Sequence, residues 1–357
     1  AEAVLSAEQA DLVSIVRGQI ADPHLSNKAR EGRADDIRTC LSCNQMCWGR
    51  RSRDYWISCL VNPSAGREFE WGGDRFEKTT TPKQILIVGG GPAGLEAARV
   101  SAERGHIVTL AEATDRLGGQ FRLAGLQPRR GQILDLLDWY TRQLSRLDVE
   151  VRLNTFLEEE DIREIGSDST ILATGSYPPN SGFQKAIPHV EKLPGIELGG
   201  VFSAEDVMAR RARLGKRVLL LDEGGNWKGC GTAWKLAEDG HEVTLITPDP
   251  LIGKELQRTT ADYPLRQRLA KLGVRFILES AITCWNHEGA EVFCFLDGTK
   301  QFVGADSLVF STTNIAEDSL MQHLQDSGMH VLNIGDSAGP RQAPFVIYEG
   351  RLTALNI

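Results

Sequence analysis

One stretch of nine residues occurs twice in the chain and indicates two copies of one folding unit. Residues 102–110 (AERGHIVTL) and 237–245 (AEDGHEVTL) agree at seven of nine positions, at an offset of 135 residues. Each stretch lies downstream of a short apolar run, ILIV at 85–88 and VLLL at 218–221. A strand, a turn, a helix and a second strand make a βαβ unit, the building block of doubly wound sheets. The repeat therefore predicts an α/β fold with two Rossmann-like units.

The C-terminal residues indicate how the two units are connected. Residues 331–334 read as a strand, and a final helix is expected from about residue 343. These segments resemble parts of the first unit, so we expect the second unit to be nested inside it. The first domain then comprises residues 81–205 and 318–357, and the second comprises residues 206–317.

The first 80 residues have a different composition. Residues 1–30 read as helix, strand, loop and helix, with a buried strand expected over Ala10–Val16. Residues 31–80 are rich in Arg, Cys, Gly and Trp and show no clear periodicity. Such a segment has little core of its own, so we expect it to fold around a ligand or to pack between domains.

Charge and composition argue against several classes of partner. The net charge of −8 and the pI near 5.5 make a generic nucleic-acid partner unexpected. We expect no membrane association, because no apolar run approaches the length of a membrane span and the first residues do not read as a signal peptide. Seven cysteines, four of them clustered, fit a reduced, cytoplasmic setting with one metal centre better than a disulfide framework.

The four clustered cysteines follow the pattern C-x2-C-x3-C-x11-C. Iron–sulfur clusters need four converging thiolates, of which a short turn can supply three and a more distant residue the fourth. We therefore expect a [4Fe-4S] cluster, with a structural zinc site as the alternative. Zinc sites usually contain two matched C-x2-C pairs, which the isolated fourth cysteine does not provide. The expected ligands are Cys40, Cys43, Cys47 and Cys59.

A complete dinucleotide fingerprint, Gly89-x-Gly91-x-x-Gly94, follows the first apolar run. It opens a helix whose N-terminal N–H groups favour a pyrophosphate, and Glu112 ends the next strand, where an acid can accept hydrogen bonds from ribose hydroxyls. We expect an FAD/NAD(P)-type domain that holds FAD or ADP; the alternative is a glycine turn used only for packing. The expected cofactor-binding residues are Gly89, Gly91, Pro92, Ala93, Gly94, Glu112, Gly118, Gly119, Gln120, Gly175, Gly335 and Asp336.

The corresponding loop of the second unit, residues 222–229, departs from this fingerprint. It is two residues longer and begins with two acids, Asp222 and Glu223. Thr247 occupies the position that corresponds to Glu112, so the acid expected for an NAD ribose is missing. We therefore expect a degenerate unit that keeps the fold and has lost nicotinamide binding.

Residues 36–47, 59–63 and 66–68 resemble the cluster segment of the old-yellow-enzyme-like iron–sulfur flavoproteins, of the NADH:flavin oxidoreductase type. That family includes 2,4-dienoyl-CoA reductase and trimethylamine dehydrogenase, and the resemblance covers essentially all 357 residues. It implies an N-terminal (β/α)8 TIM barrel that carries FMN and the substrate site. Residues 1–30 would be its last βα unit, and Arg17 would reach the FMN phosphate. The resemblance also implies that most of the barrel, with every catalytic residue, lies outside this chain.

Two branches of the family are open from the sequence. The cysteine spacing matches the dienoyl-CoA reductase type, whereas residues 222–227 and 335–341 are more similar to the trimethylamine dehydrogenase branch. The resemblance implies the electron-transfer portion of an enzyme that oxidises a small methylated amine by N-demethylation and reduces an electron-transferring flavoprotein. The alternatives are an NAD(P)H-dependent enoate or 2,4-dienoyl-CoA reductase and a non-catalytic nucleotide-binding subunit. We expect a homo-oligomer.

Overall fold

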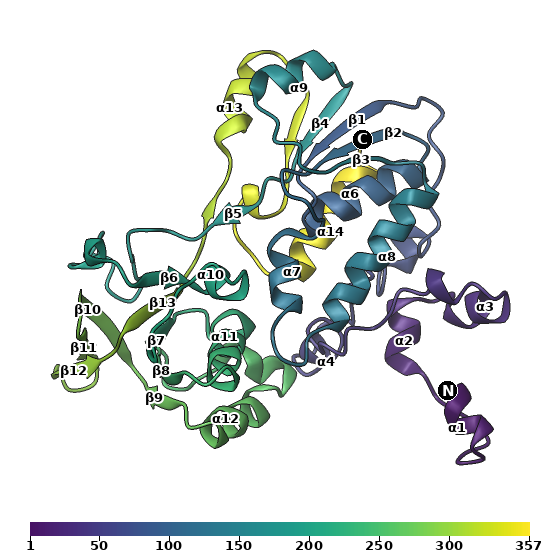
Figure 1. The fold of residues 1–357 in the computed structure, drawn as a ribbon. Helices are drawn as coiled ribbons and strands as arrows, with labels where there is room; N and C mark the ends of the chain where they lie inside the picture. The colour runs from purple at the N-terminus through teal and green to yellow at the C-terminus, as the bar shows by residue number, and fades with distance from the viewer.

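The computed structural model describes residues 1–357 and is built around two parallel sheets, each flanked by further elements (Figure 1). The sheets confirm the α/β fold class. Burial of nearly every residue in the first strand of the first sheet fits a strand that is covered on both faces. The first sheet has the strand order β15 (Val331–Asn333), β4 (Ser169–Leu172), β1 (Gln84–Val88), β2 (Ile107–Ala111) and β3 (Glu150–Arg152).

Helices cover both faces of the first sheet (Figure 1). One face, with Ile85 and Ile87, packs against α6 (Pro92–Glu103), α8 (Gln132–Arg146) and α14 (Ala343–Leu355). The opposite face, with Leu86 and Val88, packs against α9 (Glu159–Ile165) and α13 (Ser319–Asp326). Alternate residues of one strand thus enter two cores, as the two-residue period of a strand requires. The short helix α7 (Gly119–Gly125) precedes α8.

The second sheet repeats the strand arrangement of the first sheet. Its strand order is β6 (Val201–Ser203), β13 (Ser307–Ser311), β7 (Arg217–Asp222), β8 (Glu242–Ile246) and β9 (Arg275–Ile277), all parallel. The helical elements of this unit are α10 (Ala204–Met208), α11 (Trp227–Glu238), η3 (Lys254–Thr259) and α12 (Asp262–Lys271). Because β6 pairs with β13, the second unit includes residues before 206, where the sequence analysis placed its start.

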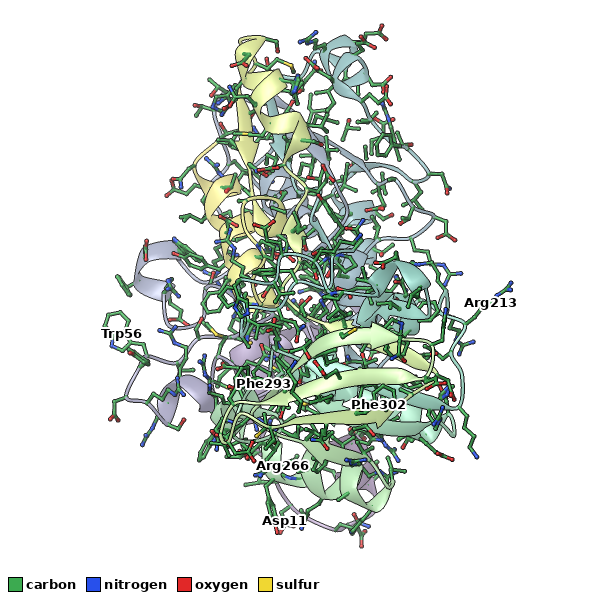
Figure 2. All side chains as sticks on the ribbon, turned by 90° about the vertical axis from the view of Figure 1, so that its left-hand side faces the viewer. Asp11, Trp56, Arg213, Arg266, Phe293 and Phe302 are labelled. Carbon is green, nitrogen blue, oxygen red and sulfur yellow. The ribbon has the colours of Figure 1, made fainter.

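A small antiparallel sheet covers the other face of the second sheet. It comprises β10 (Ser280–Asn286), β11 (Gly289–Cys294) and β12 (Lys300–Gly304). Trp285, Ala290 and Val303 face the shared core. Figure 2 shows Phe293 and Phe302 on this sheet, and Phe302 is 55% exposed.

The chain passes between the two units along a pair of short strands. β5 (Ser176–Tyr177) leaves the first unit and β14 (Ile315–Ala316) returns to it, and the two pair with each other in antiparallel fashion. After β14 the chain forms α13 and then β15, which pairs with β4 of the first sheet. The helical turn η2 (Ile196–Leu198) lies between β5 and β6, and η4 (Gly335–Ser337) follows β15 within the first unit.

The N-terminal residues extend away from the two units (Figure 1). They form α1 (Glu2–Ser6), α2 (Val16–Ala21) and α3 (Leu25–Arg30). The buried strand expected over Ala10–Val16 is wrong, because these residues form no strand and Leu12 is 89% exposed. A strand needs a neighbour for its backbone hydrogen bonds, and no other strand pairs with this segment. Asp11, which lies at the edge of the molecule in Figure 2, belongs to it.

Residues 31–80, which we call the cysteine segment, contain only short helical elements: η1 (Ala34–Asp36), α4 (Trp48–Arg51) and α5 (Glu68–Trp71). Leu41, Leu60 and Val61 of this segment belong to the same buried cluster as α6 and α8. Trp56 points outward in Figure 2 and is 73% exposed. The segment therefore packs through a few apolar anchors and leaves other large side chains at the surface.

Buried charges also attach the cysteine segment to the first unit. Arg351 of α14 pairs with Glu96 of α6 at 2.6 Å and with Asp74 of the cysteine segment at 2.9 Å. Arg38 also pairs with Asp74 and lies 5.2 Å from the ring centre of Trp139. Burial by itself raises the pKa of Glu96, but Arg351 and Arg99 outweigh it and lower this pKa to about 2. Glu96 is therefore ionised at neutral pH and depends on its arginines.

Candidate nucleotide and iron–sulfur sites

The glycine-rich turn between β1 and α6 allows very close backbone packing. Gly89 has φ +111°, and a Cβ there would lie 2.2 Å from the carbonyl oxygen of Ala173. A Cβ on Gly94 would lie 2.0 Å from the carbonyl oxygen of Gly89. Only glycine fits at either position. By contrast, no atom lies within 4 Å of a Cβ built on Gly91, so the turn is open on that side.

The first turn of α6 has the features of an anion site. Gly91 is the N-cap, Pro92 is the first helical residue, and no side chain caps the helix. The N-terminal N–H groups of such a helix are free to bind an anion, and the helix dipole favours negative charge there. Gly91, Pro92 and Ala93 all line a large cavity in front of this turn.

Glu112 lies at the end of β2, beside the glycine turn, and is 8% exposed. Its Oε2 accepts a hydrogen bond of 2.8 Å from the backbone N–H of Gly90. Its Oε1 accepts hydrogen bonds from the backbone N–H and the hydroxyl of Thr114, at 2.8 and 2.7 Å. Oε2 accepts the single bond from Gly90 and can accept a further one, and Glu112 lines the cavity. The carboxylate therefore holds the turn in place and is positioned to receive hydroxyl groups.

The cavity has a volume of about 860 Å³ and lies between the first unit, the second unit and the cysteine segment. A cavity of this size is within the usual range for small-molecule and cofactor sites. The expected cofactor-binding residues that line it are Gly89, Gly91, Pro92, Ala93, Glu112, Gly119, Gln120, Gly175 and Asp336. Three others, Gly94, Gly118 and Gly335, shape its wall without lining it.

A polar network that the sequence did not reveal joins the two units at this cavity. Gln120 donates to the carbonyl oxygen of Ser176 at 2.6 Å, and Ser176 donates to Asp336 at 3.0 Å. Asn314 donates to Gln120 at 3.1 Å, and Lys228 donates to Asn314 at 2.7 Å. Lys228 is the second residue of α11, and Asn314 lies just after β13. Both residues follow a strand of the second unit in the sequence, and this position was the signal that could have identified them.

The four clustered cysteines share one small cavity. Cys40, Cys43, Cys47 and Cys59 line a space of about 20 Å³. Burial, with a smaller contribution from the nearby thiols of Cys59, Cys47 and Cys40, raises the pKa of Cys43 to about 11, against the opposing effect of a hydrogen bond from the backbone of Gln45. Burial likewise raises the pKa of Cys59. Because the thiolate is the metal ligand, metal binding here would release protons.

The spacing of these thiols bears on the choice of metal. No three Cys, His, Asp or Glu side chains are arranged around a single metal ion. The four cysteines nevertheless surround one space that also contacts the apolar side chains of Ile20, Met46 and Leu60. Four cysteine thiols around one space are the donor set that a [4Fe-4S] cluster would use.

Arg17 lines the cysteine cavity as well. Its Nη1 donates a hydrogen bond of 2.7 Å to the side chain of Asn44, which follows Cys43 in the chain. The structure thus brings Arg17 to the cysteines. Its expected contact with the phosphate of FMN stays a prediction.

The second unit satisfies its own loop donors. Asp222 Oδ1 accepts from the backbone N–H groups of Gly224 and Gly225, at 3.0 and 3.1 Å. Asn226 caps α11 by accepting from the N–H of Lys228 at 2.8 Å. Thr247, where an NAD site would have its acid, is buried. The backbone N–H groups at the start of the helix are therefore open in the first unit, whereas side chains occupy them in the second unit.

The fold and the open nucleotide site define a flavoprotein oxidoreductase. The family model described as pyridine nucleotide-disulphide oxidoreductase matches residues 83–335, and the chain belongs to this family. The homologues also support the expected relation to old-yellow-enzyme-like flavoproteins, and include amine dehydrogenases, demethylases and enoate reductases.

Named relatives include both amine-oxidising and NADH-oxidising proteins. The chain is 35% identical over 339 residues to an NADH oxidase of Thermoanaerobacter brockii, covering 94% of this chain and 50% of that protein. It is 37% identical over 261 residues to the N,N-dimethylglycine/sarcosine dehydrogenase of Chromohalobacter salexigens, covering 73% and 37%. The chain thus spans half or less of the length of these relatives.

A solved structure matches nearly the whole chain. The 6-hydroxypseudooxynicotine amine oxidase of Pseudomonas geniculata N1 superposes with a TM-score of 0.93 at 30% identity, covering 99% of this chain and 54% of that one. The N-terminal residues and the cysteine segment therefore have counterparts in that amine oxidase. No helix of the present structure is both long and apolar enough to cross a membrane.

Proposed function

We propose that this chain is the C-terminal, electron-transfer part of an iron–sulfur flavoprotein that oxidises a small methylated amine. The relatives are about twice as long, which supports a further domain, and the likeness to a dimethylglycine/sarcosine dehydrogenase and an amine oxidase supports the substrate class. Electrons would arrive from FMN in an N-terminal TIM barrel. They would leave to an electron-transferring flavoprotein. Assembly as a homo-oligomer and a cytoplasmic setting belong to the same proposal.

The observation that carries the proposal is the difference between the two nucleotide turns. The helix α6 has no side-chain cap, whereas Asn226 caps α11 and Asp222 binds the loop before it. A nucleotide in the second unit would have to displace these contacts, at a cost of about 1–3 kcal/mol for each buried group left unpaired. The second unit would therefore bind NAD(P)H poorly, and this supports an enzyme whose electrons come from an amine.

The first unit would hold FAD or ADP. The N–H groups at the start of α6 would bind the pyrophosphate, and Glu112 would accept hydrogen bonds from the ribose. The cavity continues beyond the glycine turn to Gln120 and Asp336, and this extra room supports FAD over ADP.

The cysteines would bind a [4Fe-4S] cluster. When bound, the cluster supplies one-electron transfer. Cys40, Cys43, Cys47 and Cys59 would hold it, and the apolar side chains of Met46, Leu60 and Val61 would limit the access of water. Because Cys43 also lines the large cavity, the same loop would lie beside both cofactors.

The test is an anaerobic purification of the protein, followed by identification of the released nucleotide and an assay of iron and sulfide. The proposal expects FAD or ADP, about four irons per chain, and no rapid reduction on addition of NADH or NADPH. Fast reduction by either nucleotide would favour the reductase alternative, which the likeness to an NADH oxidase supports. ADP without iron would favour a non-catalytic nucleotide-binding subunit.

A further inference from the structure

Arg130 is a partly buried arginine that lacks an acidic partner. It lies in the loop between α7 and α8, and its Nε is buried with no hydrogen-bond acceptor. The fully buried arginines have carboxylate partners: Arg38 pairs with Asp74, Arg99 with Glu96, and Arg351 with both. Burial lowers the pKa of Arg130 to about 10, so it stays charged at neutral pH. An unpaired cation in such a place is costly without an anion nearby.

The surroundings of Arg130 point to where that anion lies. Its guanidinium sits 4.5 Å from the ring centre of Trp227, whose carbonyl oxygen accepts a 2.8 Å hydrogen bond from Gln127. Arg130 and Cys43 both line the large cavity, and both line an adjoining cavity of about 170 Å³. No carboxylate is among the residues that line this adjoining cavity.

We propose that Arg130 is the counter-charge of the cluster on Cys40, Cys43, Cys47 and Cys59, on the side where the cysteine segment meets the second unit. The inference rests on the proposed function, since it needs a cluster on these cysteines. Four thiolates make such a cluster an anion, and reduction adds one more negative charge. A nearby cation therefore favours the reduced state and raises the reduction potential. Trp227 holds the guanidinium in place from the second unit.

The experiment uses a charge-removing variant and a matched control from the same loop. Arg130→Gln removes the partly buried charge, whereas Arg129→Gln removes the same charge from an exposed neighbour that lines the adjoining cavity and not the large one. The midpoint potential of the cluster is measured by redox titration monitored by electron paramagnetic resonance, on proteins purified without oxygen. Arg130→Gln is expected to lower the equilibrium constant for reduction of the cluster roughly tenfold. This corresponds to a downward shift of the midpoint potential of about 59 mV for one electron. Arg129→Gln and Arg130→Lys are expected to stay close to the wild type.

Each outcome separates this inference from the proposed function. The absence of iron from the purified wild-type protein would overturn both the proposed function and the role of Arg130. A normal iron content with the same potential in Arg130→Gln and Arg129→Gln overturns the role of Arg130 alone. Loss of bound nucleotide from Arg130→Gln, with an unchanged potential, would show that the anion is a phosphate of the nucleotide. If Arg130→Gln does not assemble a cluster, Arg130→Ala with its potential measured at matched iron content decides, and a wild-type value rejects the proposal.

Discussion

The Oδ1 atom of Asp222 accepts a hydrogen bond of 3.0 Å from the backbone N–H of Gly224, inside the second copy of a turn that binds phosphate groups in related folds. Burial raises the pKa of this carboxyl from 3.8 to about 6. The side chain that closes the second site is therefore also a titrating group in the physiological range.

This shift predicts a dependence of stability on pH. The folded protein binds the Asp222 proton more tightly than the unfolded chain does, so this contribution favours folding below about pH 4 and is lost as the pH rises to about 6. The full loss is about 3 kcal/mol. The free energy of unfolding in urea is measured for the wild type and for Asp222→Asn across this pH range. The difference between the two free energies should change by this amount. A difference that stays constant with pH would contradict the assignment.

Replacing Cys43 by Ser is expected to remove or destabilise the cluster while leaving the nucleotide bound, because the glycine turn belongs to the first unit and Cys43 belongs to the cysteine segment. Iron and sulfide per chain, and the nucleotide released on denaturation, measure the two effects. Cys284→Ser is the matched control, since Cys284 lies on β10. Equal iron in both variants would remove Cys43 from the ligand set.

Glu112→Ala is expected to weaken the binding of ADP by about 1–3 kcal/mol, because it leaves ribose hydroxyls and the Gly90 N–H without an acceptor. Glu112→Gln keeps one acceptor oxygen and should lose less. Isothermal titration of nucleotide-free protein with ADP gives both values. An affinity unaltered in the alanine variant would remove Glu112 from the site.

Arg351→Met is expected to destabilise the protein by about 3–5 kcal/mol, because Glu96 and Asp74 would each lose one of their two arginine partners in the core. Arg341→Met breaks an ion pair with Glu349 nearer the surface and should cost about 1 kcal/mol or less. Unfolding midpoints in urea at neutral pH compare the two. Similar small losses would show that the buried network is not what holds the cysteine segment.

The pH adds a second check on this network. The pKa of Glu96 is lowered to about 2 by Arg351 and Arg99, against the opposing effect of burial. A lowered pKa stabilises the fold above about pH 4.5, and this contribution is lost as the pH falls towards about 2. The wild type should therefore lose its advantage over Glu96→Gln in acid. A constant advantage down to pH 3 would contradict this pairing.

Local patterns predicted the parts of the fold that depend on neighbours in sequence. The strand, glycine turn and helix at 84–103 were readable because apolar periodicity and glycine spacing are local signals. The strand expected over Ala10–Val16 failed because an apolar run becomes a strand only beside a partner strand, which this segment does not have. An apolar run alone does not reveal whether that partner exists.

The polar end of the cavity could not be read from the sequence. Ser176, Lys228 and Asn314 come from three separate segments, and only the packing of the second unit against the first brings them together. The absence of an acidic partner for Arg130 is likewise a tertiary property, because it depends on every side chain around that loop.

The pairing of β5 with β14 has a consequence for how such a chain can be cut and rejoined. Ser176 lies opposite Ala316, so the second unit enters and leaves through a single narrow neck. Everything between these two residues could be replaced by a tight turn without stretching the remaining backbone. Both strands of this neck belong to no larger sheet. The molecule is thus modular at this point. A chain shortened in this way would test whether the first nucleotide unit can fold by itself.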